Sequence, residues 1–106
     1  MMLALTSGCL SPKVHSDPLA GWQFSSLNNL NSNKAITDDY HSYIQQLSPE
    51  ERKSAGPMEY FEDGTGQHAV LIWIGVKNKV WKHILIYDPA GIRIRAIKYL
   101  SGHYHS

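Results

Sequence analysis

The chain has 106 residues, of which 42% are hydrophobic and 18% charged, and its formal net charge is +1. This length accommodates one domain with one modest core, and no stretch approaches the run of about twenty apolar residues that a membrane-spanning helix needs. A single cysteine excludes an intramolecular disulfide and a cysteine-rich metal site. Residues 1–66 carry four basic and eight acidic side chains, whereas residues 67–106 carry six basic side chains and one acidic one. This asymmetry indicates either an anion-binding sheet or helices and a sheet that neutralise each other.

The N-terminus resembles part of a bacterial lipoprotein signal. Residues 1–5 are apolar, and small residues then lead to the cysteine in the order Thr6-Ser7-Gly8-Cys9. This is similar to the lipobox of bacterial lipoproteins, although Thr6 stands where that family has leucine or valine. The basic start of a signal peptide is absent and the apolar run is short, so the resemblance implies a start codon further upstream. It implies lipidation of Cys9 and a membrane-anchored, periplasmic location in the cell envelope; the alternative is an incidental cysteine in a cytoplasmic protein.

Residues 1–19 are expected to be a leader and tether, and residues 20–106 a single α+β domain. The segment from Leu10 to Leu19 contains two prolines and shows no apolar period, which favours an extended tether. Trp22 and Phe24 follow and are expected to dock on the domain, because a flexible segment gains nothing by exposing them. The Asn- and Ser-rich residues after them favour turns.

Two segments have a helical pattern. Apolar residues at helical spacing form one stripe: Ile36, Tyr40, Tyr43, Ile44 and Leu47. They predict a main helix at about 37–47 with Thr37 as its N-cap. Ser48-Pro49-Glu50-Glu51 is a capping box with proline at the first helical position, and it predicts a short helix at about 49–54.

Gln67 to Leu100 has the period of two that is typical of three β-strands, and Met58 to Glu62 is a fair fourth strand. We predict a three- to four-stranded antiparallel meander with both helices packed on one face. The sequence Asp88-Pro89-Ala90-Gly91 favours a type I turn ending in a glycine bulge, which places Tyr87 opposite Arg93. The preceding hairpin is expected to have an odd-numbered loop near Lys77-Asn78-Lys79.

This register predicts two different sheet faces. An aliphatic face is expected to be the core: Val70, Ile72, Ile74, Val80, Ile84, Ile86, Ile92, Ile94 and Ala96. The opposite face is expected to hold a partner-binding patch: Trp73, Trp81, His83, Tyr87, Arg93, Arg95 and Tyr99. Two alternatives remain open, a solvated face on which arginines cover aromatic rings and a face covered by Trp22 and Phe24.

The sequence contains no nucleophile elbow, phosphate loop or dinucleotide fingerprint, and we expect neither an enzyme nor a cofactor. His103 and His105 are a weak metal pattern, and we expect no metal site. The preferred function is a small non-enzymatic binding domain outside the cytoplasm, tethered through Cys9, whose partner is an unknown protein or envelope ligand. The alternative is a single-stranded nucleic-acid-binding module that uses the basic aromatic face. A sequence pI near 7.9 argues against it.

Overall fold

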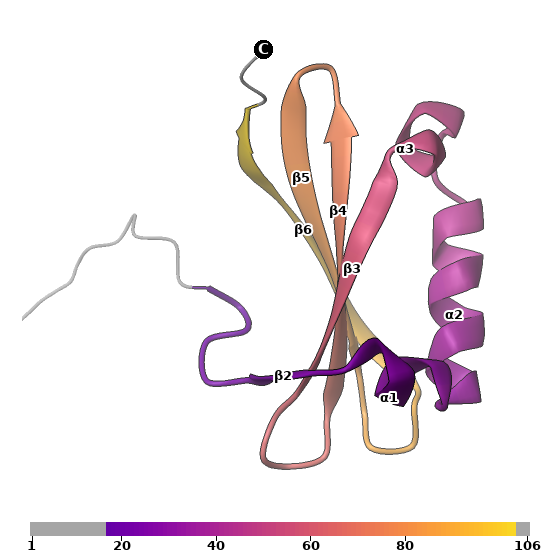
Figure 1. Cartoon of the computed structure of the whole chain (residues 1–106), viewed down its shortest axis with the longest axis vertical. Helices are drawn as coiled ribbons and strands as arrows, with labels where there is room; N and C mark the ends of the chain where they lie inside the picture. The colour runs from indigo at the N-terminus through magenta and orange to yellow at the C-terminus, as the bar shows by residue number, and fades with distance from the viewer. Residues whose placement is uncertain (1–16, 104–106) are drawn as a thin grey trace, which may run out of the picture.

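The computed structural model describes residues 17–103, which form one antiparallel sheet and three helices. The strands, in both chain and sheet order, are β2 (Gln23–Ser25), β3 (Ala55–Glu62), β4 (His68–Val76), β5 (Lys79–Tyr87) and β6 (Arg93–His103). The helices are α1 (Leu27–Asn31), α2 (Lys34–Gln45) and α3 (Pro49–Lys53), and they lie together on one side of the sheet (Figure 1). The α+β class and the antiparallel meander are confirmed. The sheet has five strands rather than three or four, and there is an additional short helix.

The predicted helices are present, but the main one begins earlier than expected. Its N-cap is Asn33, whose side chain accepts a hydrogen bond from the backbone N–H of Ile36 at 3.2 Å. Thr37 instead lies inside α2 and donates its hydroxyl to the carbonyl of Leu30 at 3.0 Å. The capping box of α3 between Ser48 and Glu51 is confirmed. No helix within residues 17–103 is long and apolar enough to cross a membrane.

The segment before α2 is more regular than its composition predicts. Ser26 caps α1 by accepting a hydrogen bond from the backbone N–H of Asn29 at 3.2 Å. β2 extends the sheet by pairing with β3, with Phe24 opposite Phe61. A five-residue helix and a three-residue strand are too short to leave an apolar period, so the sequence pattern does not reveal them.

The β4–β5 turn has two residues, and the expected odd-numbered loop is wrong. Lys77 and Asn78 both have positive φ, 53° and 67°, which a two-residue type I′ hairpin turn requires. Gly75 therefore lies opposite Val80. Because side chains alternate along a strand, this register turns every β5 side chain to the face opposite from the one expected.

The β5–β6 turn matches the prediction at its start and departs from it one residue later. Gly91 has a φ of 87° and donates its N–H to the carbonyl of Asp88 at 2.8 Å, and Tyr87 lies opposite Arg93 as expected. A register shift then places Ile86 opposite Arg95 rather than Ile94. Such a bulge adds one residue to β6 and moves the pairs from Ile86 to Trp81 by one position, and a second shift follows between Trp81 and Val80.

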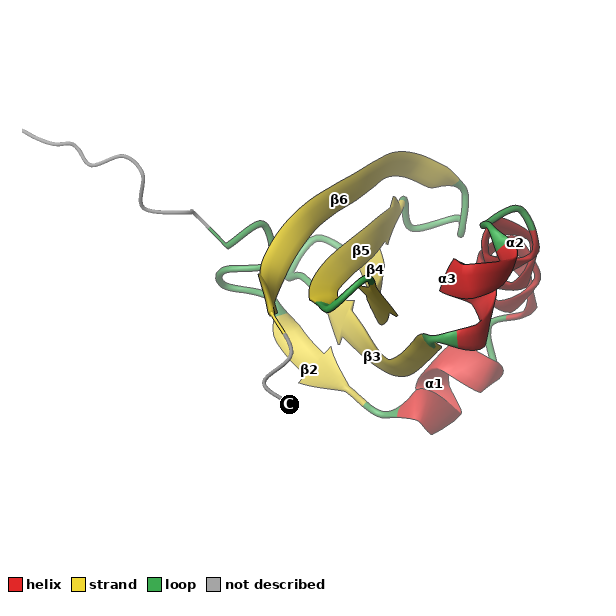
Figure 2. Cartoon of the chain, turned by 90° about the horizontal axis from the view of Figure 1, so that it is seen from above, coloured by secondary structure: helices red, strands yellow, loops and turns green. Residues whose placement is uncertain are grey.

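The sheet has a helix face and a far face, and both are covered. The helix face packs its core residues against Leu30, Ile36 and Tyr40: Tyr60, Val70, Ile72, Ile74, Leu85 and Tyr87. The far face buries a second cluster beneath Leu19 and Trp22: Ala69, Leu71, Ile84 and Ile86. Figure 2 shows the helices gathered on one side of the curved sheet, with the segment before β2 on the other.

The predicted core face is therefore corrected. Ile72, Ile84 and Ile86 are buried as expected, but Ile72 lies on the helix face and the other two on the far face. Ile92 and Ile94 were expected in the core and are 60% and 49% exposed, because they lie in the turn and at the bulge of β6. Leu19, at the end of the expected tether, is buried in the far-face cluster.

Truncation of Ile84 to alanine is expected to lower the free energy of unfolding by about 2–5 kcal/mol, because a side chain that is 1% exposed leaves a cavity. The matched control is Ile94→Ala, which removes the same atoms from a site 49% exposed and should change stability by at most about 0.5 kcal/mol. Urea denaturation followed by circular dichroism measures both. Equal losses in the two variants would contradict the assignment of the far face as a core.

Candidate functional site

The seven residues of the predicted partner-binding patch do not share one face. Four of them, Trp81, His83, Tyr87 and Arg93, lie on the helix face, since their β4 and β5 neighbours there pack against α2. The other three are on the far face: Trp73, Arg95 and Tyr99. The expectation of a single aromatic and basic patch is therefore wrong, and its physical reason is the two-residue turn together with the β6 bulge.

On the helix face, Tyr87 and Arg93 hold one carboxylate of α2. Tyr87 is fully buried, and its hydroxyl donates to Asp39 Oδ2 at 2.7 Å. Arg93 Nε lies 3.2 Å from the same oxygen, and its guanidinium lies over the ring of Tyr43. Burial and the bond to Asp39 raise the pKa of the Tyr87 hydroxyl, so it remains a donor. These contacts fasten α2 to the sheet.

A buried histidine lies beside this network. His83 is 1% exposed, and a 2.6 Å hydrogen bond joins its Nδ1 to the hydroxyl of Tyr43. Its Nε2 is buried and has no hydrogen-bond partner among the described residues. Burial lowers the pKa of His83, and the charge of Lys98 lowers it further while Glu51 raises it. The ring is therefore held neutral between α2 and the sheet.

The basic and aromatic residues at the other end of this face are paired with α3. Lys98 Nζ lies 3.8 Å from Glu51 Oε2 and 5.1 Å from the ring centroid of Trp81. The hydrogen bond from the Ser48 backbone N–H lowers the pKa of Glu51, which keeps this carboxylate charged beside Lys98. Within residues 17–103 no three side chains of histidine, cysteine, aspartate or glutamate are grouped to hold a metal ion. The charged and aromatic side chains described on the helix face are thus engaged in contacts within the domain.

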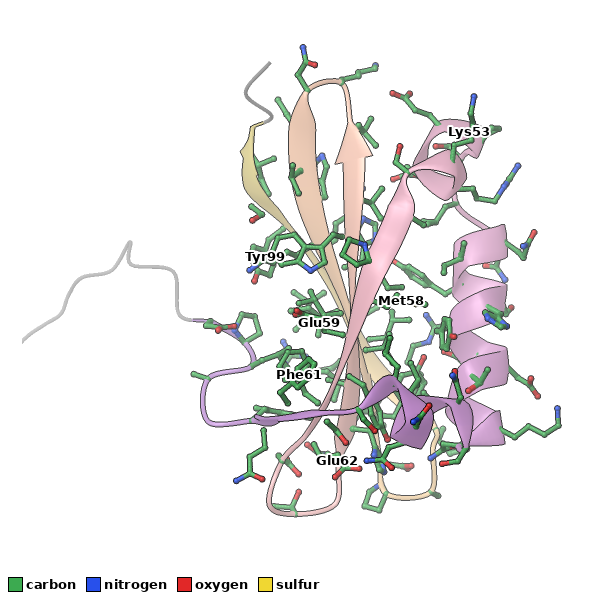
Figure 3. The ribbon with its side chains drawn as sticks, in the orientation of Figure 1. Lys53, Met58, Glu59, Phe61, Glu62 and Tyr99 are labelled. Carbon is green, nitrogen blue, oxygen red and sulfur yellow. The ribbon has the colours of Figure 1, made fainter. Side chains whose placement is uncertain are left out.

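The far face holds a pocket of about 360 Å³ between the sheet and residues 17–22. Four of its lining residues are aromatic: Trp22, Phe61, Trp73 and Tyr99. The charged lining residues are Asp17, Glu59 and Lys82. Figure 3 shows Glu59, Phe61 and Tyr99 on the side of the sheet that faces the N-terminal segment, whereas Met58 lies on the side of α2. This volume is within the range of about 300–1,000 Å³ that small-molecule sites occupy.

Lys82 lies in the middle of one cross-strand row of the pocket. It pairs with Trp73 on β4 and with Tyr99 on β6. Its Nζ is 4.5 Å from the ring centroid of Trp73 and 5.8 Å from that of Tyr99. None of the ion pairs formed within the described part of the chain involves Lys82. Its ammonium group therefore rests on aromatic ring faces inside a half-buried site.

One wall of the pocket is the turn that precedes β2. The carboxylate of Asp17 accepts the N–H of Leu19 at 3.0 Å, and the N–H groups of Ala20 and Trp22 donate to backbone carbonyls within the same turn. Trp22 docks on the domain as expected, and it does so on the far face. Phe24 does not cover that face: it is 66% exposed and contacts Phe61 edge-on from β2.

Of the predicted site residues, only Trp73 and Tyr99 line this pocket, and Arg95 lies outside it on the same face. Cys9, the predicted lipidation site, is outside the described residues. Sequence reasoning missed Lys82 and Glu59. The available signal was the register itself, because a two-residue turn at Lys77-Asn78 puts Lys82 opposite Trp73.

The buried histidine predicts a dependence of stability on pH. Because the pKa of His83 is lower in the folded state than its ordinary value of 6.5, the unfolded state binds more protons as the pH falls below that value. The free energy of unfolding should therefore decrease as the pH is lowered from 7 through the folded-state pKa. His83→Gln should remove this part of the dependence, measured by urea denaturation at each pH. His41→Gln, at an exposed position of α2, is the control and should leave the curve unchanged; a His83→Gln curve parallel to that of the native chain would contradict the assignment.

Comparison of the chain with models of protein families, with curated proteins and with solved structures finds no match. The function is therefore inferred from the residues of the pocket and from their charges.

Proposed function

We propose that this chain is a small, non-enzymatic binding domain whose ligand occupies the far-face pocket. The observation that supports this most strongly is the pocket itself, in which four aromatic rings and Lys82 converge from four strands and the N-terminal turn. Aromatic side chains beside a few charged groups are typical of the concave sites that bind small molecules. The chain's other large aromatic and basic residues on the helix face are engaged with α2 and α3.

A binding role fits the chemistry of the lining better than a catalytic one. Among residues 17–103, no serine, threonine, cysteine or histidine lines the pocket, so these residues assemble no nucleophile and base pair of the usual kinds there. The buried histidine His83 lies on the opposite face of the sheet and is bonded to Tyr43. Lys82, Glu59 and Asp17 are suited to orienting a ligand by charge.

The single-strand nucleic-acid alternative has less support. It relied on one face that combined Trp81, Tyr87 and Tyr99 with two arginines, so that successive bases could stack beside basic groups. Tyr99 and Arg95 lie on the far face, and the other aromatic residues lie on the helix face. Two carboxylates also line the pocket, and they would repel a phosphate backbone.

We further propose that the domain is anchored in the cell envelope through Cys9 and faces outside the cytoplasm. The support is the lipobox-like order Thr6-Ser7-Gly8-Cys9. Seven residues separate Cys9 from Asp17, where the pocket wall begins. A lipid on Cys9 would therefore hold the pocket within a short distance of the membrane surface.

The pocket proposal predicts a local NMR response to a neutral aromatic probe. The three tryptophans give separate indole N–H signals, and Trp22 and Trp73 line the pocket whereas Trp81 lies on the other face. Titration with 2-naphthaleneacetamide should shift the first two signals in a saturable way and leave the third in place. Trp73→Ala should abolish saturation, and Trp81→Ala is the matched control that should retain it. Uniform shifts, or none, would contradict the pocket as a ligand site.

The anchor proposal predicts fatty-acid labelling of the chain. Expressed in bacteria with its native upstream sequence and supplied with labelled palmitate, the protein should carry the label and sediment with membranes. Cys9→Ala should remove both properties, because it removes the thiol that would carry the lipid. An unlabelled, soluble wild-type chain would contradict the anchor and would leave the pocket proposal standing.

A further inference from the structure

Lys82 and Lys98 are two lysines in similar settings with different partners. Each ammonium group lies over a tryptophan ring, at 4.5 Å from Trp73 and 5.1 Å from Trp81 respectively. Lys98 also has a carboxylate, Glu51, at 3.8 Å. Lys82 takes part in no ion pair formed among residues 17–103. Within these residues, its ammonium group therefore contacts the ring faces of Trp73 and Tyr99 and pairs with no carboxylate.

We propose that the pocket binds a small organic monoanion, with an aromatic or other flat apolar body, through a carboxylate that contacts Lys82 Nζ. This inference rests on the proposed function and specifies its ligand class. A carboxylate would give the ammonium group a charge-assisted hydrogen bond in a site that is half-shielded from water. The body of the ligand would lie against the rings that line the pocket, above the aliphatic floor formed by Leu71 and Ile84.

The other charges of the pocket restrict the ligand further. Glu59 and Asp17 line the same space, so a ligand with several negative charges would be repelled. A ligand cation would need the ring faces of Trp73 and Tyr99, which Lys82 already contacts, and it would also be repelled by that ammonium group. A single negative charge on an apolar body satisfies both restrictions.

Three probes that share one ring test this assignment: 2-naphthaleneacetate, its neutral amide and 2-(2-naphthyl)ethylamine. Dissociation constants come from the indole N–H shifts of Trp22 and Trp73. The acetate should bind about tenfold more tightly than the amide, as expected for a hydrogen bond to a charged group, and the amine most weakly. Lys82→Met should remove the advantage of the acetate and leave the affinity for the amide within about twofold.

Two variants keep the test independent of folding. Lys98→Met removes the matching ammonium group from above Trp81 on the helix face, and it should preserve the preference for the acetate. Lys82→Arg keeps the charge and should retain at least part of that preference.

The outcomes separate the two proposals. Equal affinity for acetate and amide in the native chain, or tightest binding of the amine, would overturn the monoanion assignment and leave the pocket as a ligand site. Failure of all three probes to shift the signals of Trp22 and Trp73 would overturn both. A preference for acetate that survives in Lys82→Met would also overturn the assignment, since a group other than Lys82 would then recognise the carboxylate of the probe.

Discussion

The two-residue turn at Lys77-Asn78 is the constraint on which the rest of the structure depends. Its positive φ angles set Gly75 opposite Val80, and every side chain of β5 takes its face from that pairing. One more residue in the turn would move His83 and Tyr87 away from α2, so their hydrogen bonds to Tyr43 and Asp39 could not form. The same slip would carry Lys82 out of the pocket. The attachment of the helix and the chemistry of the far face are thus fixed together by one local backbone geometry.

The features that were predicted correctly from the sequence are those that residues close together in the chain determine. The apolar stripe of α2, the capping box of α3 and the glycine-ended turn before β6 are encoded within a few residues each, and each is present. The faces of the sheet were not predictable in that way, because residues 69–72 are all buried and alternation cannot identify the inner face when both faces are covered. Only the turn decides between the two registers, and Lys77-Asn78 lacks the glycine that usually signals a type I′ turn.

The site was partly predictable for the same reason. Trp73 and Tyr99 were expected to be functional from their residue types, and both line the pocket. Lys82 could be placed beside them only with the correct register, and Tyr99 pairs with it only because the bulge after Arg93 shifts β6 by one residue. The wall formed by residues 17–22 depends on tertiary contact, since Leu19 and Trp22 have no pattern that assigns them to the far face. The prolines and the missing apolar period of residues 10–19 had instead predicted that Leu19 belongs to a tether.

The two faces of this sheet are covered unequally. On the helix face, α2 supplies Asp39 as the partner of Tyr87 and Arg93, and the charge of Lys98 is balanced by Glu51 of α3. On the far face, the turn of residues 17–22 is the cover that the described residues supply, and it is too short to fill the space above Leu71 and Ile84. What remains is a hollow with aromatic walls and a lysine that forms no ion pair within residues 17–103. Because the cover is also the segment through which the chain continues toward Cys9, any ligand that contacts Leu19 or Trp22 would contact the part of the domain nearest its proposed anchor.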